Sequence, residues 1–225
     1  MIKFLLVHFL LAVVCFQSVA QVPKEKNIKK LKSNDPFEGS ITFVKQTFSD
    51  TSYYIYYIKG DCIRFDELDN CEKPSNCILF NLKNSTIKAI SPARKLYIDI
   101  QAKPYTETND SNFEIIKSQN NKKIQGYDCY QWRVRNKAQN TEVSYWVVDD
   151  NFMFWGKFLR LWNRPEKHSL YFLQIKETAG FMPMLSDERT TLRESKMELY
   201  VTKIERKKLP QSMFEIPKDY SSYDR

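Results

Sequence analysis

Most of the chain beyond residue 36 alternates between apolar and polar positions with a period of two. Between 37 and 48, for example, Ile41 and Phe43 share one face while Ser40 and Thr42 take the other. This alternation is typical of half-buried antiparallel strands. Further strands are predicted in the ranges 52–58, 77–82, 86–91, 95–100, 127–136, 141–148 and 196–204. Short turns join most of them, which predicts one large antiparallel sheet, either strongly curved or rolled toward a barrel.

One segment breaks this period. Between residues 152 and 165 the apolar side chains recur at helical spacing, Asp149 to Asn151 offer N-cap side chains, and Pro165 ends the run. The segment predicts a short amphipathic helix with an aromatic face. The helix would either pack on the sheet as ordinary core or act as a lid over an apolar cavity. If the cavity exists, the candidate ligand-binding residues are Trp155, Phe158, Leu159, Trp162, Met182 and Met184.

Two segments give weaker signals. Residues 103–121 contain Pro104 and many polar groups, so we expect a loop with one short helix or strand near 113–117. The pattern of residues 169–176 fits a helix and a strand equally well.

The first 20 residues have the pattern of a secretory signal peptide. A basic start at Lys3 precedes the apolar stretch 4–16, and Ser18-Val19-Ala20 predicts cleavage after Ala20. Residues 21–36 are rich in lysine and predict a disordered leader, followed by a single domain at 37–220 and a tail at 221–225. No later stretch approaches the roughly 20 apolar residues of a membrane span. We therefore expect a periplasmic or secreted protein that is not transmembrane, and a monomer.

Charge and partners follow from this location. The formal net charge of +8 becomes +7 once Lys3 leaves with the signal peptide, and much of the excess lies in Lys24 to Lys32. That basic stretch would contact anionic lipid or remain a solvated linker, of which we favour the linker. Nucleic acid is not an expected partner of an exported protein.

The cysteines indicate structure more than chemistry. Cys15 belongs to the signal peptide, and Val14 before it is too large for a lipoprotein signal. Four cysteines remain in an oxidising compartment. Cys71 and Cys77 flank a loop sequence and are predicted to pair, which leaves Cys62 and Cys129 as a second pair by elimination. Three connectivities are possible, and a free thiol at Cys129 stays open.

The residues needed for common catalytic sites are scarce. His168 is the single histidine outside the signal peptide, and its charged surroundings predict an exposed bystander. The five glycines are widely scattered, so a phosphate-binding loop is not expected. The cysteine spacing does not suit zinc. We therefore expect no enzyme activity, no metal and no cofactor.

Four short segments resemble a known family. They are Tyr57-Ile-Lys-Gly-Asp61 with Ile63-Arg64, Ile90 to Tyr97, Ile124 to Cys129, and Tyr200 to the end, where Leu209-Pro-Gln-Ser-Met-Phe214-Glu-Ile-Pro217 stands. Their order is similar to that of exported domains of unknown function related to the lipoprotein carriers of the LolA/LolB type. Asp219 departs from the glycine usual in that signature, and the Cys71 to Cys77 loop has no counterpart.

The resemblance implies a mainly β, α+β fold. Its implied form is an incomplete antiparallel β-barrel, or half-barrel, with short helices on the concave side and an apolar cavity between them. It also implies that the C-terminal residues dock onto the barrel, which would explain the apolar Met213, Phe214 and Ile216. No site residue of the carriers can be carried over.

Two functions are compatible with these observations. The first is a noncatalytic envelope protein that holds a lipid, an acyl chain or a lipidated protein in the cavity. The second is a protein-interaction or sensor module of the envelope whose cavity is filled by its own side chains, with a sheet edge or the Cys71 to Cys77 loop contacting an envelope partner.

Overall fold

Strands dominate the part of the chain that this computed structural model describes, residues 35–69, 71–107 and 111–223. The first six strands are β1 (Gly39–Thr47), β2 (Thr51–Lys59), β3 (Cys62–Leu68), β4 (Pro74–Asn81), β5 (Thr86–Ser91) and β6 (Leu96–Ile100). The others are β7 (Phe113–Ile124), β8 (Tyr127–Asn136), β9 (Thr141–Asp149), β10 (Phe181–Thr190), β11 (Ser195–Arg206) and β12 (Ser221–Ser222). The helices are α1 (Phe154–Trp162), α2 (Lys167–Phe172) and the 3-10 helix η1 (Gln211–Phe214). The predicted signal peptide, and the predicted leader except residues 35 and 36, lie outside the described residues.

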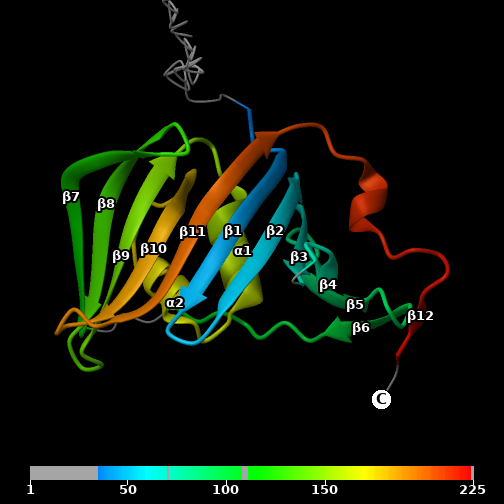
Figure 1. Cartoon of the computed structure of the whole chain (residues 1–225), viewed down its shortest axis with the longest axis horizontal. Helices are drawn as coiled ribbons and strands as arrows, with labels where there is room; N and C mark the ends of the chain where they lie inside the picture. Colours follow the sequence, from blue (N-terminus) through cyan, green and yellow to red (C-terminus); the bar gives the residue numbers. More distant parts are fainter. Residues whose placement is uncertain (1–34, 70, 108–110, 224–225) are drawn as a thin grey trace, which may run out of the picture.

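All twelve strands form one open, curved sheet in the order β12-β6-β5-β4-β3-β2-β1-β11-β10-β9-β8-β7 (Figure 1). From β1 the chain runs outward strand by strand to β6. It then crosses to the opposite edge and runs back inward from β7 to β11. The two meanders meet at the centre, where β1 and β11 pair antiparallel. The expectation of a mainly β fold with one large, curved sheet is confirmed.

The centre of the sheet depends on a glycine. Gly39, the first residue of β1, has a φ of +150°, and a Cβ there would lie 1.9 Å from the carbonyl oxygen of Glu205 on β11. A side chain would therefore force the two backbones apart. Glycine at this position lets β1 start in contact with the end of β11.

Eight strands lie where the alternation predicts them, and the other four differ from the prediction. β3 and β10 were not predicted. β7 begins where one short helix or strand was expected near 113–117, but it is longer and runs to Ile124. β12 lies in the segment predicted as a tail. β10 contains Pro183, which lies beside a bulge where β10 pairs with β9 but not yet with β11. The missing N–H of proline therefore breaks no ladder bond on that side.

Both α-helices lie against the same face of the sheet (Figure 1). The first of them, α1, buries one aromatic face, comprising Phe154, Trp155, Phe158 and Leu159. α2 buries Tyr171, whose hydroxyl is 2.6 Å from that of Thr141 on β9, and Phe172. The predicted helix is thus confirmed, and residues 169–176, left open by the sequence, form the end of α2 and the turns that follow.

The start of α1 differs from the prediction. Asp149 to Asn151 do not cap it; Met153 occupies the N-cap position, with no side-chain hydrogen bond. Asp150 is instead buried, and its carboxylate accepts a hydrogen bond from Arg206 Nη2 at 2.9 Å. Since Arg206 ends β11, this ion pair ties the beginning of α1 to the central strands.

The segment that crosses from β6 to β7 is tied to the end of α1. Asn163, in the left-handed conformation at the C-cap, donates from Nδ2 to the carbonyl oxygens of Lys103 and Pro104 at 3.1 and 3.2 Å. Residues 101–107, called the crossover below, therefore lie beside α1.

The C-terminal segment docks on the sheet, as the resemblance implied. Ile216 and Tyr220 pack on the small cluster of Cys77, Leu79 and Ile90, and β12 adds to β6 as a parallel strand. Lys59 Nζ donates to the carbonyl oxygen of Leu209 at 2.6 Å. The apolar residues near the C-terminus thus cover β4 and β5.

All four cysteines in the described part of the chain are free. Cys62 lies on β3 and Cys129 on β8, six strands apart in the sheet. At about 4.8 Å per strand that separation exceeds the reach of a disulfide several-fold. Cys77 is buried in β4, opposite Asp66, whereas Cys71 is exposed in the preceding turn. The prediction of two disulfides is therefore wrong, and all four of these cysteines are free thiols in the structure.

Candidate functional site

The six candidate ligand-binding residues all belong to one apolar core. On α1, Trp155, Phe158 and Leu159 are 2–3% exposed, and Trp162 is half-buried. Met182 and Met184 are completely buried in β10. The structure thus brings four of the candidates together on one helix face and places the two methionines in the sheet. A role for them in binding stays a prediction.

Aromatic rings fill most of the space between α1 and the sheet. Trp155 stacks on Phe43 of β1 with ring centroids 5.9 Å apart, and Phe80 of β4 meets both Phe158 and Trp162 edge-on at 5.0 Å. These rings leave a pocket of about 100 Å³, called the inner pocket below. Binding sites for drug-sized ligands have about 300–1,000 Å³. An acyl chain does not fit in this space.

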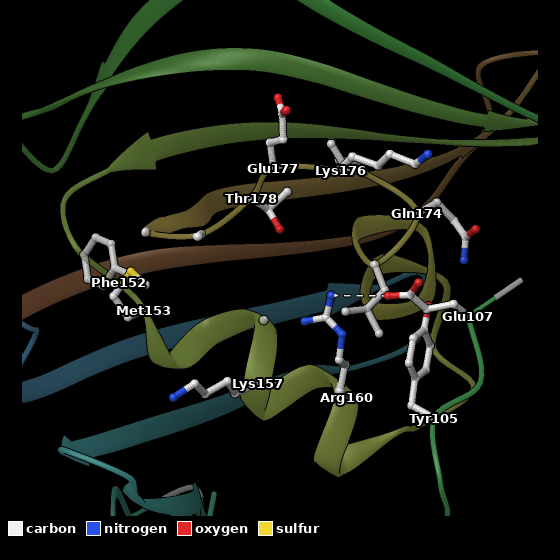
Figure 2. Close-up of a pocket in the computed structure, with 15 residues that line it drawn as sticks. Tyr105, Glu107, Phe152, Met153, Lys157, Arg160, Gln174, Lys176, Glu177 and Thr178 are labelled. Atoms are coloured by element: carbon white, nitrogen blue, oxygen red, sulfur yellow. Dashed lines mark ion pairs between the residues drawn. The ribbon is translucent and has the colours of Figure 1, made fainter. Parts of the chain in front are cut away.

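A larger hollow lies on the solvent-facing side of α1 (Figure 2). It has a volume of about 490 Å³. Its walls are α1, the crossover, and the loop 173–180 between α2 and β10. We call it the outer groove; it is lined by Tyr105, Glu107, Phe152, Met153, Gly156, Lys157, Arg160 and residues 173–180.

The outer groove combines apolar and charged side chains. Its apolar lining includes Phe152, Met153, Leu173 and Ile175, of which Met153 is 48% exposed. Its charged lining is formed by Lys157, Arg160, Lys176, Glu107 and Glu177. A second hollow of about 550 Å³ shares Tyr105, Lys157 and Arg160 with it, so the two adjoin along α1.

Arg160 is positioned where α1 faces the crossover. Its guanidinium lies 3.9 Å from Glu107 Oε1 and 6.0 Å from the ring centroid of Tyr105 (Figure 2). Both contacts are loose, and Glu107 is largely exposed. Burial raises the pKa of Tyr105. Because an exposed ion pair at this distance is weak, Arg160 can exchange Glu107 for an anionic ligand at little cost.

Sequence reasoning did not find the outer groove. Its lining comes from three segments separated by up to about 70 residues, which only the fold brings together. One local signal exists: Met153, Lys157 and Arg160 follow each other at helical spacing, with an exposed methionine on the otherwise polar face.

His168 was predicted to be exposed, and this is wrong. His168 lies in α2 and is half-buried. Its Nδ1 atom is shielded from solvent and has no hydrogen-bond partner among the described residues. Burial and the nearby Lys45 lower the pKa of His168 to about 3. The imidazole is therefore neutral at neutral pH.

Two other kinds of feature are absent from the described residues, a metal-ligand cluster and a membrane-spanning helix. Their His, Cys, Asp and Glu side chains include no group of three or more that could hold a metal ion. None of their helices combines the length and the apolar character needed to cross a membrane.

Comparison with known proteins gives one family match. The profile of a family described as a domain of unknown function (DUF4412) matches residues 37–220. No curated protein sequence matches the chain.

Several solved structures are similar to this one at low sequence identity. An uncharacterized conserved protein from Thermus thermophilus has a TM-score of 0.46 and 10% identity, over 89% of this chain and 94% of that one. A chain of the Pseudomonas aeruginosa MucA/MucB complex has a TM-score of 0.49 and 9% identity, over 80% of this chain and 56% of that one. A domain from Vibrio parahaemolyticus assigned to outer-membrane lipoprotein sorting has a TM-score of 0.30 and 8% identity, over 78% of this chain and 87% of that one. At these values the similarities do not identify a ligand.

Proposed function

Because the chain belongs to the family described as a domain of unknown function (DUF4412), whose description names no activity, we propose a function from the site itself. We propose that the protein is a noncatalytic binding protein of the cell envelope. Its ligand is the acyl chain of a lipid or of a lipidated protein. The chain would lie in the outer groove, whereas the sequence had suggested an interior cavity.

The size and lining of the outer groove are the observation that carries this proposal. Its volume of about 490 Å³ lies within the usual range for ligand sites, whereas the inner pocket is several-fold smaller. Met153, exposed on the groove wall, is unbranched and adapts its shape to flexible ligands. A half-barrel covered by short helices, as the resemblance implied, would present such a groove beside the covering helix.

The charges on the groove match an amphiphile with an anionic headgroup. Lys157 and Arg160 lie on the same exposed face of α1, next to the apolar lining. An acyl chain along Met153 and Ile175 would place a carboxylate or phosphate within reach of these cations. Guanidinium and ammonium groups favour such anions through charge-assisted hydrogen bonds.

An envelope location is supported by the N-terminal sequence. Residues 1–20 have the charge, apolar stretch and small residues of a signal peptide, with cleavage proposed after Ala20. Exported lipids and lipidated proteins expose acyl chains in this compartment, and a soluble domain with an apolar groove would shield them from water.

The test is native mass spectrometry of the protein, exported to a periplasm, purified without detergent and then titrated with palmitate. We expect a one-to-one adduct. Met153→Asp places a charge on the groove wall and should weaken binding at least tenfold. Leu192→Asp is the matched control, because Leu192 is 91% exposed on the β10–β11 turn, outside the groove lining. No uptake of palmitate would refute acyl binding, and equal uptake by both variants would refute the groove as its site.

The packed interior favours a second candidate function, an interaction module of the envelope. The β7 edge of the sheet is poorly suited to docking, because a bulge between Lys117 and Asn121 and the exposed lysines Lys122 and Lys123 blunt it. The exposed turn around Cys71 is the better candidate. This module predicts that Cys71→Trp abolishes capture of an envelope partner, while Met153→Asp leaves capture unchanged.

A further inference from the structure

The inner pocket, on the opposite face of α1 from the outer groove, has features of a second site. It lies between α1, the start of α2 and the sheet. The aromatic side chains of Tyr54, Tyr56 and Phe65 line it from β2 and β3, and those of Trp155, Phe158 and Trp162 from α1. Lys45, Glu166 and His168 also line it. Its walls are thus apolar, with a few polar groups.

Two polar atoms in the described part of the chain are buried without a hydrogen-bond partner, and both belong to residues of this pocket. They are Trp155 Nε1 and His168 Nδ1. Trp155 is 3% exposed, so a ligand oxygen reaches its indole N–H only when the side chains around the pocket shift slightly. Leaving such a group unpaired is unfavourable, and each case in a folded protein calls for an explanation. Two in one pocket of about 100 Å³ point to a polar ligand there.

The chemistry of the lining selects the ligand class. The indole N–H of Trp155 can only donate, so its partner must be an acceptor. Lys45 is a cation, and Tyr54 and Tyr56 carry hydroxyl groups that can donate as well. The charge of Glu166 opposes an anion, but Glu166 Oε1 lies 4.0 Å from Lys45 Nζ and is 43% exposed to solvent. The donors therefore outnumber the acceptors.

The volume limits the size of the ligand. A space of about 100 Å³ is smaller than the cavity of about 150 Å³ that accommodates benzene in an engineered protein core. It suits a molecule of roughly four to six non-hydrogen atoms. The aromatic walls would take a short alkyl group, and the polar groups would take its charged end.

We propose that the inner pocket binds a short-chain monocarboxylate, of the size of acetate to butyrate, with a carboxylate oxygen accepting a hydrogen bond from Trp155 Nε1. Lys45 would neutralise the charge, and the His168 ring would supply a further polar contact. This site is separate from acyl binding in the outer groove and stands or falls independently of it.

The test follows the indole N–H signals by NMR while the ¹⁵N-labelled protein is titrated with propionate. The chain has four tryptophans, and Trp155→Phe identifies the Trp155 signal while retaining an aromatic ring. We expect a saturable shift of that signal and of the His168 ring signals. Propionamide, of the same shape but uncharged, should bind at least tenfold more weakly. No shift, or equal binding of the amide, would overturn the proposal.

Two further variants keep the test decisive. For Trp155→Phe, binding is followed by the NMR signals of the His168 ring, and propionate should bind at least tenfold more weakly than to the wild type. Trp162→Phe is the matched control, because Trp162 lines the same pocket but its Nε1 is not one of the two unpaired buried atoms. Equal losses in both variants would refute a specific role of the Trp155 N–H. If Trp155→Phe does not fold, Lys45→Met replaces it in the test. Lys45→Met must weaken the binding of propionate at least fivefold and leave the binding of propionamide unchanged.

Discussion

The two faces of α1 differ in what they contact. The inner face packs Trp155 and Phe158 against rings of the sheet, with ring centroids 5.0–5.9 Å apart. The outer face carries Lys157 and Arg160, which form loose, exposed ion pairs with Asp61 and Glu107. One short helix therefore packs into the core on one side and lines the solvent-exposed outer groove on the other. Substitutions on the two faces should have very different effects.

The largest effect is expected on the inner face. Trp155→Ala removes a buried ring and leaves a cavity, so the free energy of unfolding should fall by about 3–5 kcal/mol. Urea denaturation followed by far-UV circular dichroism measures it. A loss below about 1 kcal/mol would show that the aromatic face is not core.

A smaller effect is expected from acid, again on the inner side. The pKa of His168 is about 3 in the folded protein, against an ordinary value of about 6.5. Below pH 6.5 the unfolded chain takes up a proton that the folded protein does not, so stability is retained above pH 6.5 and is lost as the pH falls toward 3. Between pH 7.5 and 5 the loss due to His168 should reach about 2 kcal/mol.

Comparison of urea midpoints at these two pH values for the wild type and His168→Gln isolates this effect from other titrating groups. The variant should lack most of the extra loss. Identical pH dependence in both proteins would mean that the His168 ring is solvated in the native state.

The smallest effect on stability is expected on the outer face. Arg160→Ala breaks an ion pair whose carboxylate, Glu107, is 79% exposed, and should change the free energy of unfolding by no more than about 0.5 kcal/mol. If the groove binds anionic amphiphiles, Arg160→Ala should nevertheless weaken the binding of palmitate several-fold in the titration described above. A large loss of stability would instead assign Arg160 to the structural framework.

Much of the fold was predictable because strands and helices leave local patterns. The alternation around Ile41 and Phe43 and the helical spacing of Trp155, Phe158 and Leu159 each reflect one buried face of one element. Four strands were missed for local reasons, of which β12 is too short, at two residues, to show any alternation. β7 has only a few apolar residues among its twelve, β10 contains Pro183, and β3 places the charged Asp66 at a buried position, where Arg64 pairs with it.

The sites were harder to predict than the fold. The sequence drew attention to the aromatic face of α1 but gave no measure of how completely the rings of Phe43 and Phe80 fill the space beneath it. The outer groove depends on the crossover meeting α1 through Asn163, a contact between residues about 60 apart in the chain. Disulfide pairing by elimination failed for the same reason, since it assumed proximity that the strand order does not provide.

The pairing of β1 with β11 has a consequence for how the protein is made. The contact between Ser40 and Glu205 spans 165 residues, so the centre of the sheet cannot close until almost the whole chain has left the ribosome. Proteins dominated by such distant contacts fold slowly. If the protein is exported, as proposed above, slow folding would keep the chain unfolded during its passage through an export channel, and the arrival of β11 would complete the centre of the sheet on the far side.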